Sequence, residues 1–158
     1  ASSSPRRMPA KMKARCAALQ AAHPDFIFAG MRLGEELARH YASADLFAFP
    51  SLSETFGNVI LEALAAGLPV VAYAEGAARE HLHDGHNGLR IESGDEAAFV
   101  RAAATLAAHP ELIRQMGRAA HASVAGLAPE SVVREFESIL SDLAEERSYE
   151  RRAAPVHA

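Results

Sequence analysis

Hydrophobic residues follow two alternating patterns along this chain. Short, mostly apolar runs bounded by turn residues are typical of strands buried on both faces of a parallel sheet. Longer stretches, with apolar residues three or four positions apart, are typical of helices packed on such a sheet. The predicted strands are Phe26–Ala29, Leu46–Phe49, Val70–Tyr73 and Gly88–Ile91. The predicted helices are about Pro9–Ala22, Glu35–Ser43, Asn58–Ala66, a short one after Gly76, Asp95–Ala107, Pro110–Val124 and Pro129–Glu146. This alternation predicts an α/β fold with a parallel sheet of about four strands flanked by helices.

The second and third predicted strands enclose one helix. Pro50 ends the first of these strands, and Gly67 with Pro69 ends the helix Asn58–Ala66 before the next strand begins. A strand, a helix and a second parallel strand form a βαβ unit, whose connection is right-handed. We therefore expect a Rossmann-like sheet with this unit at its centre.

The loop between this first strand and the helix carries the candidate chemistry. Glu54 lies where the chain leaves the strand, and the hydroxyl of Thr55, or of Ser53, can cap the helix. Gly57 lets a ligand approach the backbone closely. The free amides of the first helical turn, near Gly57 and Asn58, suit a phosphate group.

Glu62 follows Glu54 by eight residues and lies one helical turn beyond Asn58. A carboxylate there can accept two hydrogen bonds from a vicinal diol. Phosphate at one end and hydroxyl-bearing groups at the carboxylates together predict a nucleotide sugar as ligand. Either glutamate taken alone reads more simply as a solvated helix residue or as a favourable charge at a helix terminus.

The segment SETFGNVILEALAAGLPVVA resembles the signature of family-4 retaining glycosyltransferases with the GT-B fold. The resemblance covers roughly residues 25–143 and implies the C-terminal, donor-binding domain of that fold. It implies that Glu54 contacts the donor sugar and acts in catalysis, and that Glu62 holds the ribose hydroxyls. It also implies that the amides of Phe56, Gly57 and Asn58 meet the diphosphate and the sugar.

The resemblance further implies that the nucleotide base lies against the loop before the second predicted helix. Met31, Arg32 and Leu33 are the candidates there, largely through main-chain contacts. The implied reaction moves a hexose from a UDP- or GDP-sugar to an acceptor hydroxyl with retention of configuration, without a cofactor or a metal ion. A nucleotide-sugar 2-epimerase and a non-catalytic donor-binding module that needs a partner chain are alternatives.

Three histidines, His81, His83 and His86, lie in the segment HLHDGHNG. Their spacing matches no metal-binding motif, and Asp84-Gly85 is a turn signal. We interpret them as turn residues and expect no metal site.

Composition narrows the class of protein. The chain has 158 residues, 49% hydrophobic, with a net charge of −4, which argues against a nucleic-acid partner. One cysteine, Cys16, fits a reducing compartment, so we expect a cytoplasmic protein. We expect disordered segments at 1–8 and 147–158 and one nucleotide-sugar-binding domain at 9–146.

A basic cluster, Arg6 to Arg15, runs into the first predicted helix and could contact an anionic lipid surface at the inner face of the membrane. A solvated helix face is the simpler interpretation. On the same helix, Met12, Cys16 and Leu19 share one face, which predicts contact with the core.

By the resemblance, the donor-binding domain opens with two more strands, the first bearing an Arg and a Lys for the diphosphate, and follows an N-terminal acceptor domain. The sequence contains neither part. We therefore expect the chain alone to bind the donor weakly and to be inactive. The strand Leu46–Phe49 is then expected either to pair directly with Phe26–Ala29 or to leave a bare sheet edge.

Overall fold

The computed structural model describes residues 9–53, 58–127, 131, 133–134 and 137–141. The chain divides into two compact units, Ala1–His40 and Tyr41–Ala158. The helices are α1 (Ala10–Ala22), α2 (Gly34–Ala42), α3 (Asn58–Ala65), α4 (Gly76–His81), α5 (Glu96–Ala107) and α6 (Pro110–Ser123), followed by the 3₁₀ turn η1 (Ala125–Leu127).

The second unit is built on a parallel sheet of three strands, β1 (Phe47–Phe49), β2 (Val70–Tyr73) and β3 (Gly88–Ile91), in the order β1-β2-β3. Phe47 pairs with Val70, and Val70 pairs with Gly88 on its other side. All four residues of the central strand β2 are buried. The α/β class, the parallel sheet and three of the predicted strands are confirmed.

The prediction of a strand at Phe26–Ala29, the first in chain order, is wrong. In the part of the chain that the structure describes, no hydrogen-bonded ladder includes Phe26–Ala29. Its side chains are largely accessible, with exposed fractions of 59% for Phe26, 83% for Ile27 and 39% for Phe28. The local pattern is that of a strand, but a strand also needs a neighbour that accepts its backbone hydrogen bonds. Among the described residues, the outer edge of β1 has no strand beside it.

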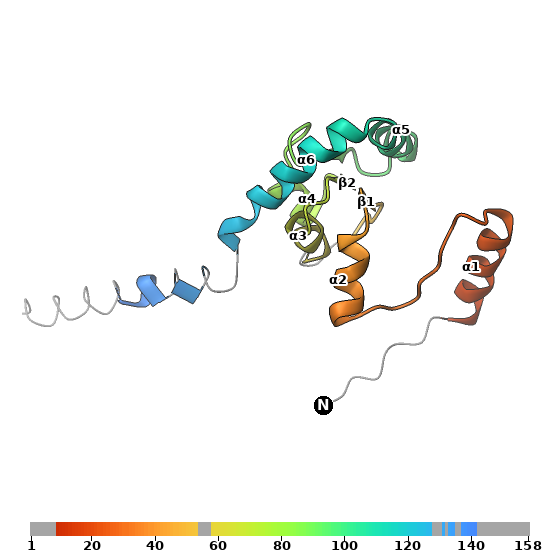
Figure 1. Cartoon of the computed structure of the whole chain (residues 1–158), viewed down its shortest axis with the longest axis horizontal. Coiled ribbons are helices and arrows are strands. Elements are labelled where there is room, and N and C mark those ends of the chain that lie inside the picture. The colour runs from red at the N-terminus through yellow and green to blue at the C-terminus, as the bar shows by residue number, and fades with distance from the viewer. Residues whose placement is uncertain (1–8, 54–57, 128–130, 132, 135–136, 142–158) are drawn as a thin grey trace, which may run out of the picture. The chain divides into compact units, whose positions relative to one another are not determined.

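Helices cover both faces of the sheet (Figure 1). Alternate residues of β2 point to opposite faces, so each face has its own apolar side chains to bury. Val70 and Ala72 pack in a cluster with α3 and α4. Val71 and Tyr73 pack in a second cluster with α5 and α6. This helix–sheet–helix layering is the one that buried parallel strands require.

The signals that bound the helices act as the sequence predicts. Gly67 ends α3 with a positive φ of 77°, which the residue after a helix commonly adopts. The Asp95 side chain caps α5 by accepting from the Ala98 N–H over 2.8 Å. Pro110 occupies the first position of α6. The predicted helix Pro129–Glu146 lies mostly outside the described residues.

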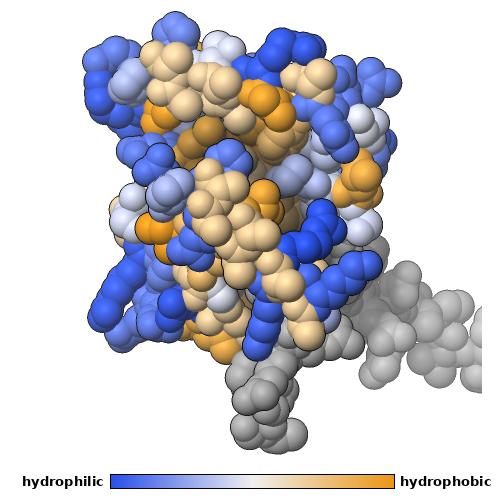
Figure 2. Space-filling view, turned by 90° about the vertical axis from the view of Figure 1, so that its right-hand side faces the viewer, coloured by the Kyte–Doolittle hydropathy of each residue, from blue (hydrophilic) through white to orange (hydrophobic). Residues whose placement is uncertain are grey.

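The first unit is much less buried than the second. None of the described residues of α1 is buried, and Met12 and Leu19 are 53% and 50% exposed, so the predicted core-facing stripe is wrong. On the face of the molecule drawn in Figure 2, hydrophobic residues are exposed at the surface among hydrophilic ones. Among the described residues, no helix is both long and apolar enough to cross a bilayer.

Candidate functional site

Four predicted donor-contacting residues, Glu54, Thr55, Phe56 and Gly57, lie outside the described residues. Their roles at the sugar, at the diphosphate and, for Thr55, as a helix cap therefore stay predictions, as does the pairing of Glu54 with Glu62. What the structure does describe is the helix that follows this loop.

Helix α3 starts on the side of the sheet where the parallel strands end, because it follows the carboxyl end of β1. Its first N–H groups have no carbonyl partner within the helix. Asn58 and Glu62 are both exposed, and four-residue spacing puts them on one face. Ile60, Ala63 and Leu64, at most 1% exposed, hold the helix in the core through its other side. Packing thus fixes the direction in which the Glu62 side chain leaves the helix.

The Glu62 carboxylate has a partner from another helix. The Tyr41 hydroxyl, near the end of α2, donates a hydrogen bond to Glu62 Oε2 over 3.1 Å. The Tyr41 ring packs against Phe47 of β1, with the ring centroids 5.7 Å apart and the planes tilted by 55°. The sequence patterns single out Glu62 but not Tyr41, because the two lie 21 positions apart and no short motif joins them.

The contact with Glu62 changes the acid–base chemistry of Tyr41. Burial raises the pKa of the Tyr41 phenol to about 12, assisted by the hydrogen bond to Glu62 and by its negative charge. The phenol is therefore protonated at any physiological pH. It acts as a hydrogen-bond donor, and Glu62 acts as the acceptor.

A second cluster of polar side chains lies at the carboxyl ends of β2 and β3. The Glu75 carboxylate, just before α4, accepts a hydrogen bond from the Ser93 hydroxyl. Arg79 approaches Glu75 to 3.8 Å, and its Nε and a terminal nitrogen donate to the Ala74 carbonyl over 3.2 and 3.0 Å. These contacts tie the loops after the two strands together at the same edge of the sheet as the start of α3.

The predicted base-contacting loop belongs to the first unit. The Arg32 guanidinium is bound to the Glu36 carboxylate at 3.2 and 3.3 Å. The Met31 and Leu33 side chains are 58% and 68% exposed. Gly30 and Gly34 flank the loop with φ values of 74° and 55°, which a glycine adopts without strain. Contact of this loop with a nucleotide base stays a prediction.

The histidine-rich turn is organised around a buried amide. The Asn87 side chain is fully buried, accepts from the His83 N–H over 2.7 Å, and donates to the His81 carbonyl and the Ser123 hydroxyl over 2.9 and 3.0 Å. No group of three metal-binding side chains lies close together within the described ranges. The turn thus has a structural explanation that needs no ligand.

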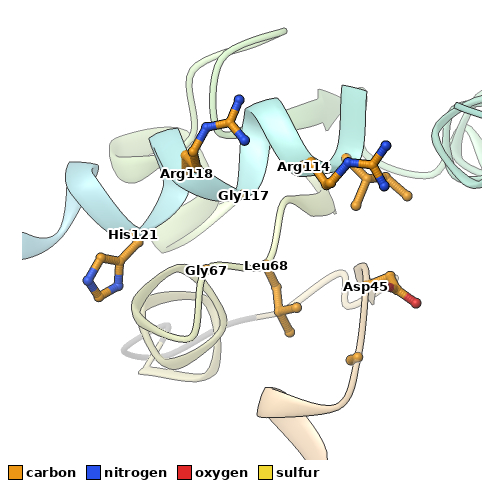
Figure 3. Close-up of a pocket in the computed structure, with 9 residues that line it drawn as sticks. Asp45, Gly67, Leu68, Arg114, Gly117, Arg118 and His121 are labelled. Atoms are coloured by element: carbon orange, nitrogen blue, oxygen red, sulfur yellow. The ribbon is translucent and has the colours of Figure 1, made fainter. Parts of the chain in front are cut away.

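A cleft in the described surface lies at the other end of the strands. This cleft of about 490 Å³ opens between α6 and the residues just before β1 and β2, among them Asp45 and Leu68. Figure 3 shows that Arg114, Arg118 and His121 project from α6 in different directions. Arg114 is also paired with Glu111, and His121 Nδ1 lies 2.8 Å from the Ala65 carbonyl oxygen. Because these three side chains do not converge, the cleft does not gather them around one ligand position.

Comparison with known proteins points to one family. The family model described as "Glycosyl transferases group 1" matches residues 3–109. A D-inositol 3-phosphate glycosyltransferase of Streptomyces coelicolor is 42% identical over 86 residues, which are 54% of this chain and 19% of the relative. A GDP-mannose-dependent alpha-mannosyltransferase of Mycobacterium tuberculosis is 44% identical over 79 residues, 50% of this chain and 21% of the relative. The chain thus spans about a fifth of the length of these curated relatives.

Solved structures agree with these sequence matches. Sucrose-phosphate synthase from Thermosynechococcus elongatus superposes with a TM-score of 0.74 and 27% identity, over 91% of this chain and 37% of that protein. The Anabaena protein HepE, crystallised with UDP, superposes with a TM-score of 0.70 and 26% identity, over 84% of this chain and 36% of HepE. HepE has also been crystallised with UDP-glucose.

Proposed function

This chain belongs to the family of the glycosyl transferases group 1, and from this premise we propose that it is the donor-binding half of a retaining hexosyltransferase. The proposed donor is a UDP- or GDP-hexose, and the proposed acceptor is a hydroxyl group bound by another part of the protein. One observation carries the proposal. Asn58 and Glu62 share the exposed face of α3, whose opposite side is locked in the core.

The proposed donor lies along this face of α3. The diphosphate meets the N–H groups of the first turn, where the helix dipole favours negative charge. The ribose hydroxyls donate to the Glu62 carboxylate one turn further along. The two parts of this ligand thus correspond to the two polar features of the eight-residue helix α3. The amides at its start would bind the diphosphate, and the one carboxylate beyond them would bind the ribose.

Charge moves onto the leaving diphosphate during the proposed reaction, so the fixed helix amides stabilise the transition state more than the ground state. Glu54 would orient the donor sugar for attack from the leaving-group side, with Phe56 and Gly57 contributing amides. Thr55 would cap the helix, and Met31, Arg32 and Leu33 would contact the base. No cofactor or metal ion takes part in this scheme.

The names of the relatives support this assignment at the level of substrate class. One relative is named for GDP-mannose, and HepE was crystallised with UDP-glucose. Both are nucleoside diphosphate sugars, the class of donor proposed here. We place the protein in the cytoplasm, since its one cysteine fits a reducing compartment. Lys11, Lys13 and Arg15 could add a contact with anionic lipid.

Replacing Glu62 tests the proposal. In the full-length protein that carries this chain, Glu62→Ala removes a charged acceptor worth about 1.5–3 kcal/mol of binding. Donor affinity should therefore fall by roughly tenfold to a hundredfold, measured by calorimetry with UDP and with GDP and as KM for the sugar donor.

The matched control is Glu96→Ala, which removes an exposed carboxylate from the first turn of α5, far along the chain from α3. Its donor affinity should stay within twofold of the wild type. Unchanged affinity and turnover in the Glu62 variant would contradict the proposal.

A further inference from the structure

Tyr41 donates a hydrogen bond to the Glu62 carboxylate. Its hydroxyl reaches Glu62 Oε2 at 3.1 Å from a different helix, so the contact does not follow from the geometry of α3 alone. Glu62 is exposed, and an exposed glutamate samples several rotamers, so fixing its side chain costs conformational entropy. A partner that selects one rotamer in advance reduces that cost when a ligand binds.

The position of the Tyr41 hydroxyl is itself fixed by packing. The Tyr41 ring packs on Phe47, and Phe47 stacks on Phe49 with the ring centroids 5.8 Å apart and the planes 15° from parallel. All three rings pack against the cluster that holds α3 and β2. The position of the hydroxyl thus depends on the packing of the Tyr41 ring against strand β1 and against the core cluster beneath α3.

The hydrogen bond also leaves room for a ligand on the carboxylate. Tyr41 occupies one acceptor position on Oε2, and an ionised carboxylate offers about four such positions over its two oxygens. Oε1 and the second lone pair of Oε2 can still accept the two hydroxyls of a vicinal diol.

We propose that Tyr41 is a positioning residue, which holds the Glu62 carboxylate in the orientation that receives the 2′- and 3′-hydroxyls of the donor ribose. This inference rests on the proposed function, because it takes Glu62 as the ribose ligand. It adds a specific consequence: the loss of one phenolic oxygen weakens recognition of the ribose and of no other part of the donor.

Tyr41→Phe in the full-length protein tests the inference, because phenylalanine keeps the ring that packs on Phe47. Binding of UDP and GDP is compared with binding of their 2′,3′-dideoxy analogues by calorimetry. We expect Tyr41→Phe to weaken the ribose nucleotide about fivefold, the effect of one lost hydrogen bond, and to leave the dideoxy analogue unchanged. The ratio of the two affinities does not depend on the fraction of protein that is folded.

Glu62→Ala in the same assay separates the inference from the proposed function. Loss of the preference for ribose in Glu62→Ala, together with a reduced preference in Tyr41→Phe, supports both. A full preference in Tyr41→Phe beside a lost preference in Glu62→Ala overturns the role of Tyr41 alone. A preference that survives in Glu62→Ala, or no binding of either nucleotide by the wild type, overturns the proposed function and this inference with it. Equal weakening of ribose and dideoxy nucleotides by Tyr41→Phe shows a merely structural contact and overturns the inference.

Discussion

Single side chains in this protein take their roles from partners far away in the sequence. Glu62 contacts Tyr41 across 21 positions, and Asn87 contacts Ser123 across 36. The glutamate stands out in the sequence because of its motif, whereas Asn87 reads there only as part of a turn. The structure shows that this amide joins the turn before β3 to helix α6.

Replacing Asn87 should therefore destabilise the fold. Asn87→Ala leaves the backbone N–H of His83 and the carbonyl of His81 without their partner. A buried polar group that loses its partner costs about 1–3 kcal/mol, so we expect a loss of about 3 kcal/mol in the free energy of unfolding. Urea denaturation measures this change.

The control in the same turn is His86→Ala, which replaces an exposed side chain. Its free energy of unfolding should lie within about 0.5 kcal/mol of the wild type. Equal stability of the two variants would show that the Asn87 network contributes nothing.

At the scale of elements, local sequence signals fixed the helix ends, whereas pairing decided the strands. Gly67, Asp95 and Pro110 act through their own backbone and side-chain chemistry, so their effects could be read from the sequence. The run Phe26–Ala29 has the same kind of apolar pattern as Phe47–Phe49, yet only the second is a strand. A strand forms only when a neighbouring strand pairs with its backbone hydrogen-bonding groups, and a local sequence pattern does not reveal that neighbour.

Helix α6 packs closely against the end of α3 because Gly117 has no side chain. A Cβ atom at Gly117 of α6 would lie 2.5 Å from the carbonyl oxygen of Gly67, the residue that ends α3. Gly117→Ala therefore pushes α6 away from the end of α3. Overpacking costs about 1–3 kcal/mol, against a gain of about 1 kcal/mol from the better helix former.

Because the obstacle at Gly117 is a backbone atom that cannot rotate away, we expect a net loss of about 1–2 kcal/mol. Thermal unfolding measures it, with Gly126→Ala as the control, since a Cβ at Gly126 meets no atom within 4 Å. A Gly117→Ala variant more stable than the wild type would show that helix propensity outweighs the clash.

At the scale of the whole molecule, the chain corresponds to one part of its relatives, matching 19% and 21% of two of them. In the proposed reaction this part binds the donor, and the acceptor is bound elsewhere. Both substrates must be held in line for the sugar to transfer, and such positioning accounts for a large share of enzymatic rate acceleration.

The isolated 158-residue chain should accordingly transfer no sugar, whereas the full-length protein should do so. The measurement is release of UDP or GDP from the sugar donor with and without acceptor, for both proteins at equal concentration. Sugar transfer by the isolated chain would show that the donor and acceptor sites are both present in it.

The sequence by itself determined the α/β class, three of the strands, the ends of several helices, and the resemblance to the family through two glutamates within the longer motif SETFGNVILEALAAGLPVVA. These features depend on residues close together in the chain, so local chemistry encodes them. Only the tertiary structure decided that Phe26–Ala29 is no strand, that Asn87 is a buried link, and that Tyr41 meets Glu62. Each of these depends on two segments brought together by packing, and the free energy of such a contact belongs to neither segment alone.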